Sequence, residues 1–127
     1  MRESFGGLMT SFAALRAERQ KTWRAELAQR LSLLVNERRF VEPLPDQVWL
    51  FGSRARGDWD GWSDTDLIVV AEEPGMAERW ADHLMAAGLG ADVIAMNREQ
   101  WQALPSHPSA IWRAVAEQAI PLLGQEP

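Results

Sequence analysis

The chain has 127 residues, of which 46% are hydrophobic and 24% charged, a balance typical of one globular domain spanning residues 1–127. Cysteine is absent, which excludes disulfides and thiolate metal sites, and the net charge of −5 argues against a dedicated nucleic-acid-binding protein. No apolar run approaches the ~20 residues of a membrane span, and the N-terminus lacks a signal-peptide pattern. We therefore expect a cytoplasmic protein with no membrane association and no direct nucleic-acid binding.

The first predicted element is a long helix from about Thr10 to Arg39. Thr10 or Ser11 can cap its start, a break near residues 19–22 fits its unusual length, and the prolines at 43 and 45 end it. We expect the helix to pack on a sheet, although part of it can instead extend beyond the domain as a surface for a partner or a second copy. Its apolar side chains recur mainly at gaps of three and four: Phe12, Leu15, Trp23, Leu27, Leu31 and Leu34.

Downstream, short apolar runs alternate with helical patterns, which predicts an α/β fold of the α+β type. Strands are expected at 48–51, 64–70 and 91–96, and residues 121–123 can add a closing strand. Helices are expected at 76–88, at 98–104 after an Asn97 cap, and after a Ser109 cap. Residues 54–57 have room for one helical turn, which the polar loop 58–63 follows. The prediction is a small mixed sheet of three to four strands with helices packed on it.

Two carboxylates stand at the start of the second predicted strand. Asp64 and Asp66 are two residues apart, so on a strand they point to the same face. Such a pair can hold two Mg²⁺ ions about 3.5–4 Å apart, the separation used for displacement at phosphorus. Oxygen-only donors suit Mg²⁺ better than zinc.

A third carboxylate follows from the expected topology. The second strand, the helix 76–88 and the third strand form a βαβ unit, whose two strands should be parallel. Parallel strands begin at the same edge, so Asp92 is expected to approach Asp64 and Asp66. There Asp92 can bind a metal ion or act as a general base.

The end of the first strand supplies groups that suit a phosphate. If this strand is antiparallel to the second, Gly52 and Ser53 lie beside the carboxylates. Gly52 lets a phosphate come close to the backbone, and free N–H groups of the turn, with the Ser53 hydroxyl, can bind its oxygens. Arg54 and Arg56 can neutralise further charge. The joint arrangement predicts a metal–triphosphate site, although a lone Gly-Ser pair is a common turn and Asp-x-Asp a common solvated strand end.

Other candidate sites have less support. Neither a P-loop nor a dinucleotide-binding glycine motif is present. His83 and His107 lack metal-ligand spacing and are expected to be surface or packing residues. Trp59 and Trp62 can stack on a base or pack within their loop. The remaining tryptophans in helical patterns are expected to be core residues: Trp23, Trp80, Trp101 and Trp112.

The motif residues resemble the polymerase-β-like nucleotidyltransferase superfamily, and specifically the minimal nucleotidyltransferases of prokaryotes. Their pattern is Gly-Ser, ten residues and Asp-x-Asp, matched here by Gly52–Ser53, Arg54 to Ser63, and Asp64–Thr65–Asp66. The strand after Asp66 and the segment Asp92–Ile94 are also similar, so the resemblance covers about residues 47 to 96. It implies that Asp64, Asp66 and Asp92 bind Mg²⁺, with two ions expected, and that Gly52–Ser53 binds the triphosphate.

The same resemblance implies transfer of a nucleoside monophosphate, most often AMP from ATP, to a hydroxyl with release of pyrophosphate. Many proteins of this kind are antitoxins that inactivate a HEPN-domain toxin by AMPylation of a tyrosine. This chain has no Tyr, so its acceptor would lie on another molecule unless a Ser or Thr served. Two alternatives stay open: an antitoxin that acts by occlusion without turnover, and transfer to a small molecule such as an aminoglycoside. About 46 residues precede the motif, which is long for a minimal member.

Overall fold

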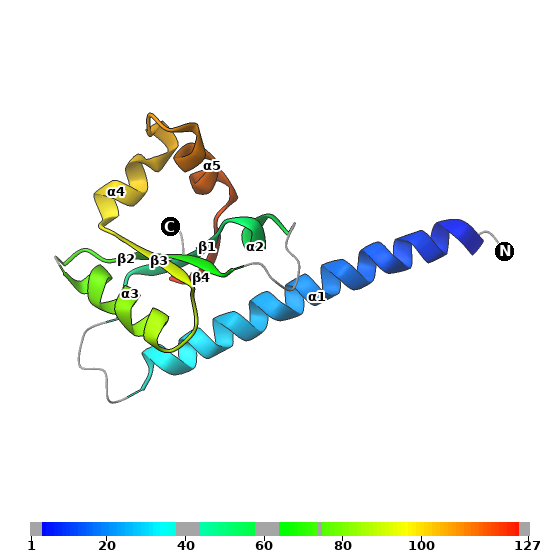
Figure 1. The fold of residues 1–127 in the computed structure, drawn as a ribbon, viewed down its shortest axis with the longest axis horizontal. Helices are drawn as coiled ribbons and strands as arrows, with labels where there is room; N and C mark the ends of the chain where they lie inside the picture. Colours follow the sequence, from blue (N-terminus) through cyan, green and yellow to red (C-terminus); the bar gives the residue numbers. More distant parts are fainter. Residues whose placement is uncertain (1–3, 38–43, 58–63, 74, 125–127) are drawn as a thin grey trace.

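The computed structural model describes residues 4–37, 44–57, 64–73 and 75–124, with the backbone alone described for residues 4–11. These residues form a four-stranded mixed sheet of order β3-β2-β1-β4 with helices on both faces, which confirms the predicted fold class (Figure 1). The elements in chain order are α1 (Ser4–Val35), β1 (Gln47–Phe51), α2 (Ser53–Arg56), β2 (Asp66–Val70), α3 (Met76–Ala86), β3 (Asp92–Met96), α4 (Arg98–Ala103), a 3₁₀ turn (Leu104–Ser106), α5 (Ala110–Gln118) and β4 (Ile120–Leu123).

The strand directions agree with the sequence-based prediction. β1 is antiparallel to β2 with Phe51 opposite Asp66, and β2 is parallel to β3 with Asp66 beside Asp92. β4 pairs antiparallel with β1 on its other side, so the expected closing strand is present. α3 makes the connection from β2 to β3, as a parallel pair requires. The end of β1 therefore lies at the same sheet edge as the beginnings of β2 and β3.

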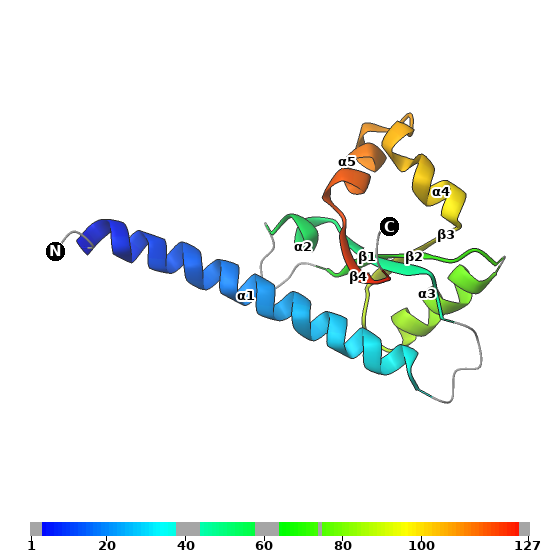
Figure 2. The same ribbon diagram turned by 180° about the vertical axis from the view of Figure 1, so that it is seen from behind.

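The two faces of the sheet are covered by different helices. On one face, Val48, Leu50, Leu67 and Val69 pack with buried residues of α1 and α3. The opposite face packs against α4 and α5, as Figures 1 and 2 show from opposite sides, through Trp49, Ile68, Val70 and Met96. Two hydrophobic clusters thus enclose the sheet, and Trp80 of α3 is fully buried in the first of them.

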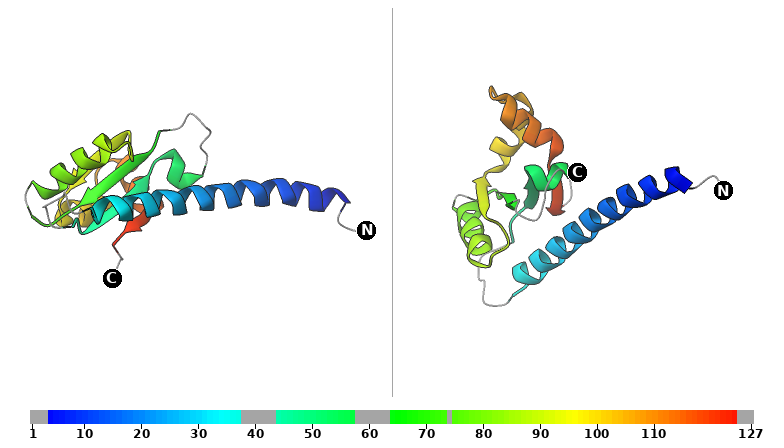
Figure 3. Two further views of the ribbon diagram at one scale, coloured as in Figure 1. Left: turned by 90° about the horizontal axis from the view of Figure 1, so that it is seen from below. Right: turned by 45° about the vertical axis from the view of Figure 1, so that its right-hand side comes forward.

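Among the side chains of α1 that the structure describes, those buried in the core belong to the C-terminal half of the helix. Its buried residues are Leu27, Leu31, Leu34 and Val35, whereas Phe12 and Leu15 are 66% and 54% exposed. The N-terminal half extends well beyond the sheet (Figure 3), which is the second of the two arrangements that the sequence left open. Although α1 has 32 residues, neither it nor any other helix in the described part of the chain is apolar enough to cross a membrane.

The predicted limits of α1 were wrong at both ends. The helix begins at Ser4, so Thr10 and Ser11 lie inside it, and it runs through residues 19–22 without a break. Glycine in a helix costs only about 1 kcal/mol, so Gly6 and Gly7 do not stop propagation from the anchored half. The helix ends at Val35, before Arg39, which lies outside the described residues with the rest of 38–43.

The helices after β3 start where their capping residues predict. Asn97 and Gln100 form a capping box: the Gln100 amide donates to Asn97 Oδ1 at 2.7 Å, and the Asn97 amide donates to Gln100 Oε1 at 2.8 Å. Ser109 Oγ accepts from the Ile111 amide at 3.2 Å, which caps α5.

The other tryptophans predicted to be core residues are only partly buried: Trp23, Trp101 and Trp112.

Candidate active site

The structure brings Asp66 and Asp92 together. They are register partners at the first positions of the parallel strands β2 and β3. Alternation along each strand places Asp66 on the face of Ile68 and Asp92 on the face of Ile94, and both of these isoleucines belong to the cluster under α4 and α5. The two carboxylates therefore project on the same side of the same sheet edge.

Asp64 lies outside the strand that was predicted to contain it. β2 begins at Asp66, where its partners Phe51 and Asp92 are the last and first residues of their own strands. The pairing ends at Thr65, whose carbonyl accepts from the Ala91 amide at 2.9 Å and from the Asp92 amide at 3.4 Å. Asp64 is exposed beyond this end. The predicted strand 64–70 was thus too long at its start, because the neighbouring strands offer Asp64 no ladder to join, and the alternation of strand faces does not apply to Asp64.

Asp92 and Asp64 nevertheless both act electrostatically on Asp66. The pKa of Asp66 is raised above its ordinary value of 3.8, first by burial and then by the negative charges of Asp92 and Asp64. Asp64, although it is not on the strand, is thus close enough to Asp66 to contribute to this shift. The site therefore concentrates negative charge around a half-buried carboxylate.

The burial of Asp66 and the repulsion from its neighbours predict that Asp66→Asn stabilises the chain at neutral pH when no divalent cation is present. The folded-state pKa of Asp66 is raised, so its protonated form favours folding; that contribution is complete below about pH 3.8 and is lost as the pH rises through the raised pKa. Melting temperatures measured in chelator from about pH 8 to pH 4 should show the variant higher by a few degrees at neutral pH, with the gap closing at low pH. The exposed Asp82→Asn on α3 is the matched control and should change little. If the variant is less stable than the unaltered chain at neutral pH, the claim that the charged form of Asp66 destabilises the fold is contradicted.

The donor chemistry of this cluster fits a divalent cation. The donors are carboxylate oxygens alone, which Mg²⁺ prefers. A cation beside them would offset both the burial and the repulsion that raise the pKa of Asp66. Within the described segments, however, no three Asp, Glu, His or Cys side chains stand close enough to form a metal-binding group. The structure thus pairs Asp66 with Asp92 and leaves Asp64 nearby without gathering all three around one point. The predicted loop 58–63, with Trp59 and Trp62, lies outside the described residues.

Gly52 lies against the carboxylate of Asp66. Its backbone has φ 79° and ψ −157°, a conformation that only glycine adopts readily. A Cβ atom at this position would stand 2.5 Å from Asp66 Oδ2, so no larger residue fits without moving the carboxylate. The predicted meeting of the Gly-Ser turn with the strand carboxylates is therefore realised through a direct approach of Gly52 to Asp66.

The turn after Gly52 is the four-residue helix α2, which begins at Ser53. The amides of Ala55 and Arg56 both donate to the Gly52 carbonyl at 3.1 Å, so these two groups are engaged within the turn and are not donors for a phosphate. Ser53 is half-buried and Arg56 is exposed. The expectation of free amides thus fails for the second half of the turn.

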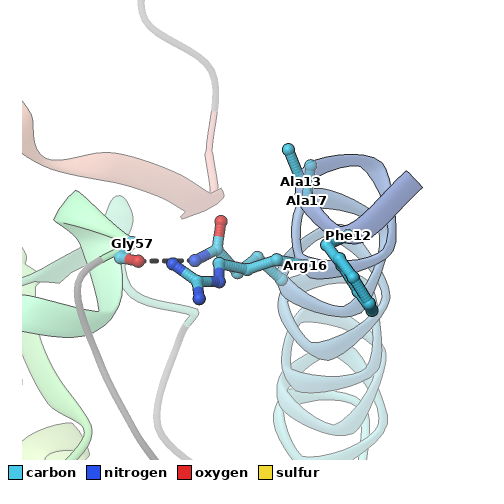
Figure 4. A pocket seen from close by; sticks show the side chains of 6 residues that line it. Phe12, Ala13, Arg16, Ala17 and Gly57 are labelled. Carbon is cyan, nitrogen blue, oxygen red and sulfur yellow. Dashed lines mark hydrogen bonds between the residues drawn. The ribbon is translucent and has the colours of Figure 1, made fainter. Parts of the chain in front are cut away.

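Two residues of α1 contact this turn, and sequence reasoning missed both contacts. The guanidinium carbon of Arg54 lies 4.4 Å from the centre of the Trp23 ring, a cation–π arrangement. Gln20 Nε2 donates a hydrogen bond to the Gly57 carbonyl, drawn as a dashed line in Figure 4. The periodicity of α1 marked Trp23 as a core residue and gave no indication of either partner, because both partners are far away in the sequence.

With this geometry established, comparison with known proteins identifies the class. The family model described as the nucleotidyltransferase domain matches residues 31–105, and the chain belongs to this family. The matched region contains the Gly-Ser turn and all three carboxylates, and it confirms the family that the Gly-Ser and Asp-x-Asp spacing predicted. Nucleotidyl transfer is therefore the class of reaction that this domain serves. Gln20 and Trp23 lie outside the matched residues.

Two solved structures are similar in fold. A toxin–antitoxin with AMP-PNP aligns with a TM-score of 0.47 and 24% sequence identity, over 78% of this chain and 74% of that one. A protein of Sulfolobus solfataricus to which nucleotidyltransferase activity is ascribed aligns with a TM-score of 0.45 and 17% identity, over 80% and 84% of the two chains. At these scores neither likeness bears on function. No characterised protein with a curated description matches the sequence.

Proposed function

We propose that this chain transfers AMP from ATP to a hydroxyl of a protein partner, with release of pyrophosphate, and that the partner is a HEPN-type toxin which it inactivates. The observation that carries the proposal is the pairing of Asp66 with Asp92 at a sheet edge where Gly52 reaches the Asp66 carboxylate. The family supports nucleotidyl transfer. The antitoxin context rests on the resemblance of the Gly-Ser and Asp-x-Asp spacing to minimal nucleotidyltransferases.

In the proposed reaction, the acceptor oxygen attacks the α-phosphorus of ATP, and the bond from this phosphorus to the leaving pyrophosphate breaks. Asp66 and Asp92, with Asp64 beside them, would hold Mg²⁺, which supplies charge neutralisation at the phosphates and activation of the attacking oxygen. Asp92 is more exposed than Asp66, so it is the carboxylate placed to accept the acceptor's proton. Gly52 and Ser53 would face the phosphates, and Arg54 and Arg56 would offset their charge.

The acceptor must be supplied by another molecule if it is a tyrosine, because this chain has no Tyr. The helix α1, which projects beyond the sheet with Phe12 and Leu15 exposed, offers surface for such a partner.

Labelled ATP tests the proposal. The chain, Mg²⁺ and a HEPN-domain protein encoded beside it are incubated with ATP labelled at the α-phosphate or, in a parallel reaction, at the γ-phosphate. Only the α label should appear on the partner, because AMP is transferred and pyrophosphate leaves. Transfer of the γ label would indicate phosphorylation and would overturn the nucleotidyl reaction. If neither label appears on a partner protein, the proposal that the acceptor is a protein is overturned.

The exposed half of α1 also favours a second candidate, an antitoxin that neutralises its toxin by occlusion alone. In that case complex formation suffices, and toxin inhibition should survive Asp66→Asn. Under the proposed reaction, inhibition should be lost in Asp66→Asn although the complex still forms. Toxin activity measured with each variant decides between the two.

A further inference from the structure

The turn α2, which follows Gly52, is contacted by residues of α1 that lie outside the region matched by the family model. α2 has only four residues, and a helix of this length is not stable by itself. Ala55 is its one buried residue among those described. The position of Ser53 and the direction of the Arg54 side chain therefore depend on what else contacts the turn.

Gln20 and Trp23 supply these contacts, one at each end of α2. Trp23 stacks beneath the Arg54 guanidinium, whereas Gln20 donates to the carbonyl of Gly57, the left-handed residue at φ 85° that ends the helix. The fit at Gly57 is close, since a Cβ there would stand 3.2 Å from both Gln20 Nε2 and Gln20 Oε1. The two α1 residues are three positions apart and thus lie on one helix face.

α1 itself is firmly placed at this level. Trp23 packs against the first hydrophobic cluster, and Leu27 and Leu31 are almost fully buried in it one and two turns further on. On the N-terminal side, Phe12 points away from Gly57 while Arg16 extends toward it beside an open hollow of about 380 Å³ (Figure 4). Gln20 and Trp23 therefore lie between the buried part of the helix and the half that projects beyond the sheet.

We infer that Gln20 and Trp23 are positioning residues for nucleotide binding: they fix α2, and with it the Gly52–Ser53 turn and the Arg54 side chain, before the triphosphate binds. This inference rests on the proposed function, because it assumes that Arg54 neutralises phosphate charge. A long arginine side chain has many rotamers in water, and the face of Trp23 selects among them before the ligand arrives. The benefit appears in ATP affinity and not in the chemical step, which the carboxylates carry.

The inference predicts a separation of KM from kcat. Trp23→Leu keeps an apolar side chain but removes the ring, and Gln20→Met keeps the length but removes the donor. Each should raise the KM for ATP roughly three- to tenfold, in line with a lost cation–π contact or hydrogen bond, while kcat stays within about twofold. Trp23→Phe retains an aromatic face and should restore most of the affinity. Leu33→Ala, at an α1 residue that is 64% exposed, is the control and should leave both constants unchanged.

Equilibrium binding of Mg²⁺-ATP to the full chain, measured without any acceptor, separates this inference from the proposed function. If the unaltered chain binds Mg²⁺-ATP and the Trp23→Leu and Gln20→Met variants bind it more weakly, the positioning role is supported. Equal or tighter binding by these variants overturns that role alone, and so does a fall in kcat with KM unchanged, which is the mark of a merely structural defect. If the unaltered chain binds no Mg²⁺-ATP, the proposed function fails and the positioning role fails with it.

Discussion

Asp66→Asn and Asp92→Asn should each abolish nucleotidyl transfer, with a loss on the order of 10²–10³-fold or more. The two carboxylates are register partners on β2 and β3 and share a face. Removing either charge therefore leaves only one of the two carboxylates to bind the cation that would neutralise the phosphates. Asn keeps the size of the side chain, so the loss reports charge and not packing. The measurement is the initial rate of α-label transfer from ATP to the protein partner at saturating Mg²⁺.

The pKa of Asp66 supplies the control for this experiment. Because burial and neighbouring charges raise it, Asp66→Asn should be at least as stable as the unaltered chain at neutral pH. An inactive yet stable variant would show that the charge of Asp66 lowers the stability of the fold and is required for activity. Asp82→Asn, an exposed carboxylate change on α3, should transfer at the normal rate. If transfer persists in both Asp66→Asn and Asp92→Asn, neither carboxylate is required for the reaction.

Gly52→Ala should destabilise the fold and inactivate the site together. The backbone at Gly52 has φ 79° and ψ −157°, and a residue with a side chain there costs about 1–3 kcal/mol. The added methyl group would also stand 2.5 Å from Asp66 Oδ2, so Asp66 must move away from its place beside Asp92. We expect a loss of transfer of about 10²-fold or more, because a 1 Å displacement of a reacting group has this effect. Denaturant unfolding and the transfer rate are measured on the same preparation.

Gly88→Ala is the matched control for Gly52→Ala. Gly88 also has a positive φ, of 76°, but no atom in the described part of the chain lies within 4 Å of the position that a Cβ would occupy. The control should therefore show the conformational cost, about 1–2 kcal/mol, with transfer unchanged. If Gly88→Ala lost as much activity as Gly52→Ala, loss of stability would explain both, and the contact between Gly52 and Asp66 would have no role of its own.

Much of the fold was predictable because its signals are local. The Asn97 and Ser109 caps, the helical pattern of α3 and the short apolar strands each act over a few residues, and the βαβ rule then determines that β2 and β3 are parallel. This rule is also what placed Asp92 near Asp66. The Gly-Ser and Asp-x-Asp spacing identified the family without any structural information.

The remainder depends on contacts between distant segments. The start of β2 is set by the lengths of β1 and β3, so the sequence around Asp64 gives no sign that Asp64 is left outside the ladder. The partners of Gln20 and Trp23 on α2 depend on the angle at which α1 crosses the domain, and helical periodicity does not specify that angle. The start of α1 at Ser4 likewise reflects continuation of an anchored helix, against which local capping signals at Thr10 and Ser11 have little weight.

Anomalous diffraction from crystals grown with Mn²⁺ and a non-hydrolysable ATP analogue tests the pairing of Asp66 and Asp92 as a cation site most directly. A Mn²⁺ peak should appear about 2.0–2.2 Å from carboxylate oxygens of both Asp66 and Asp92, with the phosphates of the analogue against Gly52 and Ser53. A peak elsewhere, such as the opposite sheet edge near Glu72 and Glu73, or nucleotide bound without either carboxylate in contact with Mn²⁺, would contradict the account.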